Sequence, residues 1–266
     1  MANQKLISFD LQADFAFFKK PDHNVGILLS YNMLHKPALL GILGAIIGLE
    51  GYQKKGELPE YYHKLKDIPV GIEPLEGFHE KGNFQKTSVK YTNTVGYAND
   101  DGNLLVEETM LVKPAYRCYL LLDLENELHA KLYEYLKNGQ AEYVPYLGKN
   151  EFQAWIISIN GFIQEYEYKI FDERSDFFIR SIFIKNGILK NQKINVKITL
   201  RNKDTVHRPT FTYFERLPIG FEEGKMIQYE MAEFALTDWT IAADSTIDQL
   251  YEIYRDNDKP QIIQLF

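Results

Sequence analysis

Two stretches of the sequence carry residue types that could bind a polyanion. The first is residues 30–37, which read SYNMLHKP and stand directly before an apolar, helix-prone run. The start of a helix presents free N–H groups and the positive end of its dipole, and both favour a phosphate. Tyr31 adds a ring on which a base could stack. The candidate contacts of this helix-start loop (residues 30–37) are Ser30, Tyr31, Asn32, His35 and Lys36. The alternative is a plain loop with a capping role.

The second stretch is residues 84–97, where Lys86, Lys90, Tyr91 and Tyr97 stand among Thr, Ser and Asn. A polar β-ribbon with basic and aromatic side chains can lie along a nucleic-acid strand. The alternative is an ordinary solvated hairpin, which is the commoner case.

The patterns that mark metal sites and common enzyme sites are missing from the sequence. The six histidines do not pair at metal-ligand spacing, and neither H-E-x-x-H nor C-x-x-C occurs. The hydrolase, P-loop and dinucleotide fingerprints are missing as well. Cys118 is the single cysteine and stands in an apolar run, which is typical of an inert core thiol. We therefore expect no metal, no cofactor and no catalytic residue.

Charge is distributed unevenly along the 266 residues, whose formal net charge is −7. Residues 173–216 hold ten Lys/Arg against four Asp/Glu, and residues 217–266 hold ten acids against three bases. A basic block next to an acidic end suits a protein that meets a polyanion on one face and a protein partner on another. A solvated sheet face with alternating lysines is the alternative interpretation.

Neither a leader nor a membrane span is evident in the sequence. It begins MANQKLISFD, without a charged start followed by an apolar stretch. The longest apolar helix candidate, Pro37–Leu49, is too short to cross a bilayer. We therefore expect a cytoplasmic protein that makes no membrane contact.

A strand and a helix must position the first candidate site. Partial alternation of apolar residues predicts a strand over residues 5–18. A helix is expected over Pro37–Gly48, because proline suits the first helical turn and the residues that follow are nearly all apolar. Gly41, Gly44 and Gly48 share one face of this helix, and a mid-helix glycine costs about 1 kcal/mol relative to alanine. A backbone, such as that of the sheet, that packs closely on this face would offset the cost.

A hairpin must position the second candidate site. Strands are expected over residues 84–97 and 104–123, on either side of a turn at residues 99–103. The turn contains an Asp-Gly step, which favours the positive φ of a tight hairpin.

The helix and strand that follow complete an order of secondary-structure elements that is found in known folds. A helix over residues 124–137, capped by Asp123 and ended by Asn138-Gly139, precedes a strand over residues 152–159. The resulting order β-α-β-β-α-β predicts an α+β, ferredoxin-like fold, an order shared with RNA-recognition folds. Residues 160–236 predict further strands.

Two segments are similar to motifs of one protein family. Residues 30–48 resemble its loop and first helix, with the pattern P-[ST/A]-x-x-G-x-x-x-A-[IL]. Residues 145–152, PYLGKNEF, are similar to its P-x-L-G-[RK]-[SN]-E-F segment before a strand. On these motifs the chain resembles the CRISPR-associated family-five proteins, which are subunits of type I Cascade surveillance complexes. The likeness is greatest to the type I-B branch.

The resemblance implies a fold, a ligand and partners. Residues 1–160 would form an RNA-recognition-like palm with a β-hairpin thumb at about 84–103, and residues 161–266 would form a β-rich region with an acidic tail. The chain would bind and cap the 5′ handle of the CRISPR RNA, contact the backbone and large subunits, and meet target DNA only through the complex. Besides the helix-start loop, the implied RNA contacts are Lys86, Lys90, Lys113 and Lys149.

The resemblance also bears on catalysis. One branch of the family, in type I-C systems, cuts precursor RNA with a tyrosine, a lysine and a histidine. Lys113 matches the lysine, but Pro114 stands where the histidine would be. A metal-independent ribonuclease needs both an acid and a base, so a non-catalytic subunit is expected. Two alternatives stay open: an endoribonuclease that matures CRISPR RNA, with His35 as a substitute, and a ferredoxin-like scaffold for protein contacts without an RNA role.

Overall fold

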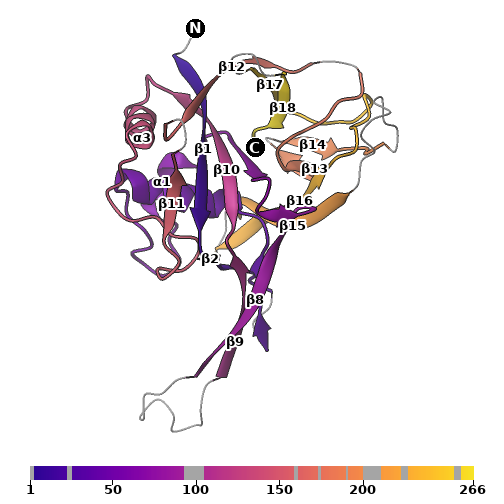
Figure 1. Cartoon of the computed structure of the whole chain (residues 1–266). Helices are drawn as coiled ribbons and strands as arrows, with labels where there is room; N and C mark the ends of the chain where they lie inside the picture. Colours follow the sequence, from indigo (N-terminus) through magenta and orange to yellow (C-terminus); the bar gives the residue numbers. More distant parts are fainter. Residues whose placement is uncertain are drawn as a thin grey trace.

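A computed structural model of the chain shows a mixed α/β protein that consists mostly of strands (Figure 1). The structure describes residues 3–22, 26–92, 105–158, 161–172, 175–189, 191–199, 211–222, 227–254 and 259–266. The expected turn at residues 99–103 lies outside these residues. So do five members of the basic block, namely Arg174, Lys190, Arg201, Lys203 and Arg208.

The central sheet has the strand order β18-β17-β12-β1-β10-β6, and β11 also pairs with β1. Its strands are β1 (Gln4–Ala13), β6 (Val70–Pro74), β10 (Ala115–Asp123), β11 (Ala154–Ile157), β12 (Gln164–Ile170), β17 (Leu250–Tyr254) and β18 (Gln261–Gln264). One edge of β1 pairs with β10 along its length, and the other edge is shared by β11 and β12. The predicted first strand is thus shorter than residues 5–18, and the chain continues as β2 (Phe15–Ala16) and β3 (Phe18–Lys19).

Alternation along β10 separates two apolar layers. Cys118 and Leu120 belong to the large core that also contains the buried residues of α1 (Lys36–Ile47) and α3 (Glu127–Lys137). Tyr119 belongs to a second cluster, formed with the strands at the end of the chain. Burial raises the pKa of the Cys118 thiol, in agreement with the core position expected from the sequence.

Helix α1 confirms the prediction of a helix at Pro37–Gly48 to within one residue, and Gly48 is its C-cap with φ of 81°. Its glycine face packs on α2 (Glu60–Leu65), because a Cβ on Gly44 would overlap the Cβ of Tyr61. The prediction of a backbone neighbour on this face is therefore wrong. The neighbour is a side chain of α2, a short helix that the sequence did not predict.

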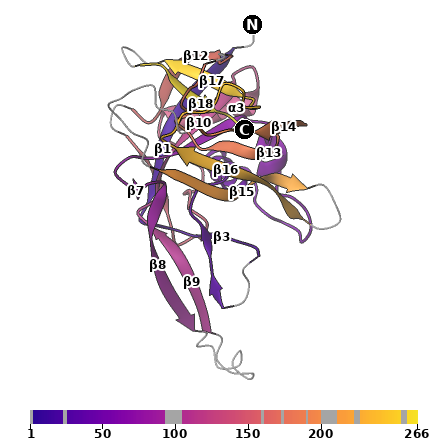
Figure 2. The ribbon, with the colours of Figure 1, turned by 90° about the vertical axis from the view of Figure 1, so that its right-hand side faces the viewer.

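The predicted hairpin exists and is an insertion between two strands of the central sheet. It consists of β8 (Asn83–Thr92) and β9 (Leu105–Val112), and it projects well beyond the rest of the fold (Figures 1 and 2). Short strands pair with it: β2 joins β9 and β7 (His79–Glu80) joins β8 at its root, and β4 (Ile27–Leu28) runs parallel to β9 further out, at Glu107 and Glu108.

The strand predicted over residues 104–123 is in fact two strands. It breaks at Lys113, which has φ of 48° and donates its backbone N–H to Asp14 O at 2.8 Å. The break separates β9, which belongs to the hairpin, from β10, which belongs to the central sheet. The second strand of the order β-α-β-β-α-β is therefore β6, and the sequence pattern missed it.

Helix α3 begins later than predicted. Its N-cap is Asn126, whose Oδ1 accepts hydrogen bonds from the backbone N–H groups of Leu128 and His129. Asp123 instead accepts a hydrogen bond from Glu125 N and stays in the turn before the helix. The predicted end of the helix at Lys137 is confirmed.

The second half of the chain forms a four-stranded sheet and also completes the central one. The smaller sheet has the order β14-β13-β16-β15. Its strands are β13 (Phe183–Leu189), β14 (Gln192–Asn195), β15 (Thr212–Glu222) and β16 (Gln228–Thr237). The acidic end supplies β17 and β18 to the central sheet, so the expected division at residue 160 runs through that sheet. In the described part of the chain, no helix is long and apolar enough to cross a membrane.

Candidate nucleic-acid interface

Ser30 and Tyr31 form β5 (Ser30–Tyr31), which pairs with β3 inside the fold. Ser30 Oγ accepts a hydrogen bond from Phe18 N at 2.9 Å. The Tyr31 ring is 3% exposed and packs edge-on against His35, and Lys20 Nζ lies 5.1 Å from its centroid. Burial raises the pKa of the Tyr31 hydroxyl. Tyr31 is therefore not the exposed stacking platform that its polar neighbours suggested.

A carboxylate of the protein occupies the anion-binding position of the helix-start loop. Glu215 of β15 accepts hydrogen bonds from the backbone N–H groups of Asn32 and Met33, each at 3.0 Å. The Tyr213 hydroxyl donates to it at 2.7 Å, and Lys20 Nζ forms an ion pair with it at 3.2 Å. The loop thus binds an anion, as its residue types indicate, but that anion is a side chain of the chain itself.

Asn32 connects the helix-start loop to the root of the hairpin. Its Nδ2 donates to Gly82 O at 2.7 Å, and its Oδ1 accepts from Phe84 N at 3.0 Å. Its carbonyl oxygen accepts a hydrogen bond from the Tyr116 hydroxyl at 2.8 Å. Because Asn32 is 2% exposed, its role is to position the first residues of β8.

His35 caps α1 and is enclosed by aromatic rings. Its Nδ1 accepts a hydrogen bond from Ala38 N at 3.3 Å. The rings of Phe18, Tyr31 and Tyr229 surround it, with centroids 5.4 to 5.8 Å away. Burial lowers the pKa of His35 to about 3, so its imidazole is neutral near pH 7. The predicted role as an RNA donor is therefore wrong, and the capping alternative describes this residue.

Lys36 donates from Nζ to the main-chain oxygen of Phe266 at 2.9 Å, and so ties the start of α1 to the last residue of the sequence. All five candidate contacts of the helix-start loop are thus engaged inside the fold. Together they hold β15, the start of β8 and the end of the chain against α1.

The segment 145–152 fixes the root of the hairpin. Gly148 has φ of 88°, and a Cβ there would overlap the carbonyl oxygen of Phe17. Phe17 N donates to Leu147 O at 3.1 Å. A glycine is therefore required at this point, both for its backbone conformation and for the close approach of the β2–β3 segment.

Lys149 is enclosed where this segment meets the hairpin. Its Nζ forms an ion pair with Glu108 of β9 and lies 4.9 Å from the ring centroid of Tyr91 and 5.1 Å from that of Phe17. Burial acts to lower the pKa of Lys149, but the hydrogen bond and charge of Glu108 outweigh it and hold the pKa above its ordinary value. Lys149 is thus placed to position the hairpin.

Three of the predicted RNA contacts remain exposed on the hairpin and its root. Lys86 and Lys90 lie on the same face of β8, opposite Leu111 and Glu107 of β9. The Lys90 side chain is 64% exposed and forms an ion pair with Glu107 at 3.5 Å. Lys113 is exposed at the bend that ends β9. A nucleic-acid strand can reach this face of the ribbon.

The described members of the basic block are partly neutralised by acids. Arg180 Nε pairs with Glu73 at 2.7 Å, and Lys197 pairs with Asp244. This distribution favours the alternative of a solvated sheet surface over a concentrated polyanion site.

The sequence matches no known family model and no curated protein. Among solved structures, it is similar to a CRISPR protein from Archaeoglobus fulgidus, at 10% identity over 98% of this chain and 99% of that chain, with a TM-score of 0.47. A chain of a CRISPR RNA-guided surveillance complex is 11% identical over 88% of this chain and 90% of its own, with a TM-score of 0.43. A chain of the type III-B Cmr-beta complex bound to cognate target RNA and AMPPnP is 11% identical over 91% of this chain and 86% of its own, with a TM-score of 0.44. Each of these similarities concerns the path of the backbone alone.

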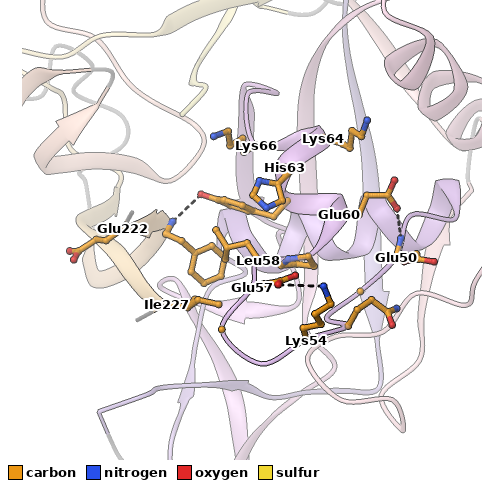
Figure 3. A pocket seen from close by; sticks show the side chains of 16 residues that line it. Glu50, Lys54, Glu57, Leu58, Glu60, His63, Lys64, Lys66, Glu222 and Ile227 are labelled. Atoms are coloured by element: carbon orange, nitrogen blue, oxygen red, sulfur yellow. Dashed lines mark hydrogen bonds and ion pairs between the residues drawn. The ribbon is translucent and has the colours of Figure 1, made fainter. Parts of the chain in front are cut away.

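A pocket of about 880 Å³ lies between α2 and the β15–β16 hairpin (Figure 3). Its lining mixes bases and acids: Lys54 pairs with Glu57 at 3.5 Å, and Glu60 accepts a hydrogen bond from Glu50 N. Neither sign of charge dominates there. Within the described ranges, no group of three or more His, Cys, Asp and Glu residues could hold a metal ion.

Sequence reasoning missed Glu215 and the positioning role of Asn32. The two residues are 183 positions apart, so no local pattern links them. The available signal was the number of donors in residues 30–37, which indicated an anion but not its source.

Proposed function

We propose that the protein is a non-catalytic subunit of a type I CRISPR Cascade complex, where it binds and caps the 5′ handle of the CRISPR RNA. The observation that carries the proposal is the projecting hairpin β8–β9 (Figure 2), whose root is fixed by the segment 145–152. A long ribbon with Lys86 and Lys90 on an open face can follow an RNA strand and reach a neighbouring subunit.

The topology supports the palm-and-thumb part of the proposal. Strands β11, β1, β10 and β6 lie side by side in that order, and α1 and α3 connect them. This arrangement has the β-α-β-β-α-β order of a ferredoxin-like palm. The hairpin is inserted between β6 and β10, where a thumb would project towards the backbone subunit. Contact with the large subunit, indirect contact with target DNA and the type I-B assignment rest on the sequence resemblance.

The proposal that the subunit does not cut RNA rests on the residues that would have to do so. His35 is buried and its Nδ1 caps α1, so the imidazole is out of reach of an RNA strand and can serve it neither as an acid nor as a base. Pro114 lies in the bend after β9, and its carbonyl oxygen accepts a hydrogen bond from Ala13 N at 3.2 Å. Lys113 is thus left without the histidine partner that the cleaving branch of the family would provide.

The test uses the purified chain and a CRISPR repeat RNA. We expect the chain to bind this RNA more tightly than a scrambled RNA of equal length, and to leave it intact in the presence of a chelator. Equal affinity for both RNAs would contradict specific recognition of the handle, and no binding to either RNA would favour the scaffold alternative. Site-specific cleavage that leaves a 2′,3′-cyclic phosphate would establish the ribonuclease alternative.

A further inference from the structure

The segment that leads into the hairpin forms a pocket of its own. The pocket has a volume of about 650 Å³ and is lined by residues 77–81 and 83–85. Its lining residues belong to β7, to the start of β8 and to the chain before β7, at the root of the hairpin; Figure 2 shows where these two strands lie. No candidate contact from the sequence lies in it.

Lys81 occupies an unfavourable backbone conformation beside this pocket. It forms, with Gly82, the two-residue turn between β7 and β8, and their φ values are 52° and 82°. A tight turn with two positive φ values favours Asn-Gly or Gly-Gly, because a side chain with a bulky stem is strained there. The Lys81 side chain is exposed, and among the described residues it makes no ion pair.

The surrounding structure prevents this turn from relaxing. Asn32 Nδ2 donates to Gly82 O at 2.7 Å, and Gly82 N donates to His79 Nδ1 at 3.0 Å. A Cβ on Gly82 would stand 2.9 Å from the Cβ of Tyr213, so the turn also lies directly against β15. Residues held in such conformations by over-determined surroundings concentrate at functional sites.

The other side chains of the pocket have the chemistry of a nucleotide site. Phe78 is 36% exposed, which leaves ring surface open to a base. Asn83 and Gln85 are exposed and carry amides that can hydrogen-bond base edges. Glu80 is the acid in the lining, and its carboxylate can accept a hydrogen bond from the amino group of a base.

We propose that this pocket binds one nucleotide of a single-stranded RNA, with the base on the Phe78 ring and a phosphate at Lys81. The inference rests on the proposed function and extends it to a subsite at the root of the hairpin. Lys113 also has a positive φ, and it follows Val112, which pairs with Gln85. Lys81 and Lys113 therefore lie at the same end of the ribbon, and this supports the proposed subsite.

The test compares four variants of the full chain in a fluorescence titration with a short labelled single-stranded RNA and in a thermal melt. Lys81→Gly removes the charge and the strain, and Lys81→Arg keeps the charge. Phe78→Leu removes the ring but stays apolar. The control is Asn191→Gly, at φ of 65° in the turn between β13 and β14, because asparagine tolerates this left-handed conformation better than lysine does.

We expect Lys81→Gly to melt at a higher temperature than the parent while binding RNA about fivefold more weakly, with a salt slope reduced by about 0.7. Phe78→Leu should lose about tenfold in affinity. Lys81→Arg should bind like the parent, and Asn191→Gly should leave the affinity unchanged.

The outcomes separate the pocket from the proposed function. Parent-like RNA affinity in both Lys81→Gly and Phe78→Leu would overturn the nucleotide pocket and leave the proposed function standing. A parent chain that does not bind the RNA at all would overturn both proposals.

Discussion

At the scale of single residues, His35 makes the stability of the fold depend on pH. Its pKa is about 3 in the folded chain and 6.5 in its ordinary state, so below pH 6.5 the unfolded chain binds a proton that the folded chain excludes. The stability that its neutral form contributes is therefore complete above pH 6.5 and is lost as the pH falls towards 3.

We predict that His35→Asn reduces this pH dependence. Asparagine can cap a helix but does not titrate. Below pH 6.5 the parent should lose about 1.4 kcal/mol of unfolding free energy per pH unit through His35, and the variant should not show this loss. Urea unfolding of parent and variant at pH 7 and pH 5 measures the difference. Equal losses in both proteins would show that His35 is not the buried neutral group described above.

Two glycines of α1 differ in the space around them and provide a matched pair. A Cβ on Gly44 would overlap the Cβ of Tyr61, whereas a Cβ on Gly41 would be 3.5 Å from the ring carbon Cζ of the same residue, an ordinary contact. Gly44→Ala should therefore cost about 1–3 kcal/mol of unfolding free energy. Gly41→Ala should be neutral or stabilise the chain by up to about 1 kcal/mol. Similar effects of the two changes in denaturant unfolding would argue against the packing of α2 on this face.

The roles of the helix-start residues were only partly predictable. The types of residues 30–37 predicted donors and a cap, and both are present. The sequence could not show that Glu215, far along the chain, supplies the anion. Nor could it show that Tyr31 and Asn32 are buried, because their burial depends on strands that pack over them from other parts of the chain.

At the scale of elements, the pair Lys149 and Glu108 anchors the hairpin to the segment before β11. The Glu108 side chain is 8% exposed and the Lys149 side chain 22%. Lys149→Met would leave a buried carboxylate without its partner, at a cost of roughly 3 kcal/mol. Adding Glu108→Gln should recover most of this loss.

Hydrogen exchange is the measurement that locates the effect of these two variants. In Lys149→Met the amides of β8 and β9 should exchange faster, while those of β1 change less. A uniform increase over all strands, or no recovery in the double variant, would contradict the role of this pair at the root of the hairpin.

The open face of the hairpin can be tested by charge reversal. Lys86→Glu/Lys90→Glu should weaken binding of single-stranded RNA and reduce the salt slope, by about 0.7 for each phosphate that the chain no longer neutralises. Lys64→Glu/Lys66→Glu on and after α2 makes the same change of charge at another exposed place (Figure 3) and is the matched control. If both double variants lose affinity equally, the effect is that of net charge and not of the hairpin.

Strand β6 and helix α2 were not predictable from the sequence, and for the same physical reason: each is short and contains or follows residues that are typical of loops. Strand β6 is five residues long and contains Gly71 and Pro74, both of which usually indicate a loop. Gly71 is needed because Gln264 O of β18 would be 2.9 Å from a Cβ there. Helix α2 is six residues long and follows a proline, so it lacks the length over which a helical period can be read. The long apolar helix α1, by contrast, was predictable from its own residues.

At the scale of the whole molecule, the end of the chain completes the sheet that its beginning starts. Val70 and Phe266 exchange backbone hydrogen bonds at 2.8 and 3.2 Å, and Lys36 bonds to Phe266 as well. The acidic segment predicted as a tail is therefore part of the central fold. Composition could not show this, because the strand pairing joins residues far apart in sequence. The consequence is that the hairpin projects from a body in which both halves of the chain share one sheet (Figure 1).

The central claim is that this body holds the 5′ end of a CRISPR RNA and that its hairpin grips the RNA. The most direct measurement is photo-cross-linking in a Cascade complex assembled from this chain, the other subunits and a CRISPR RNA, with thiouridine placed at single positions of the RNA. We predict cross-links from the 5′ handle to peptides that contain residues 77–92. Cross-links confined to the spacer part of the RNA, or a complex that holds its RNA equally well without this chain, would contradict the account.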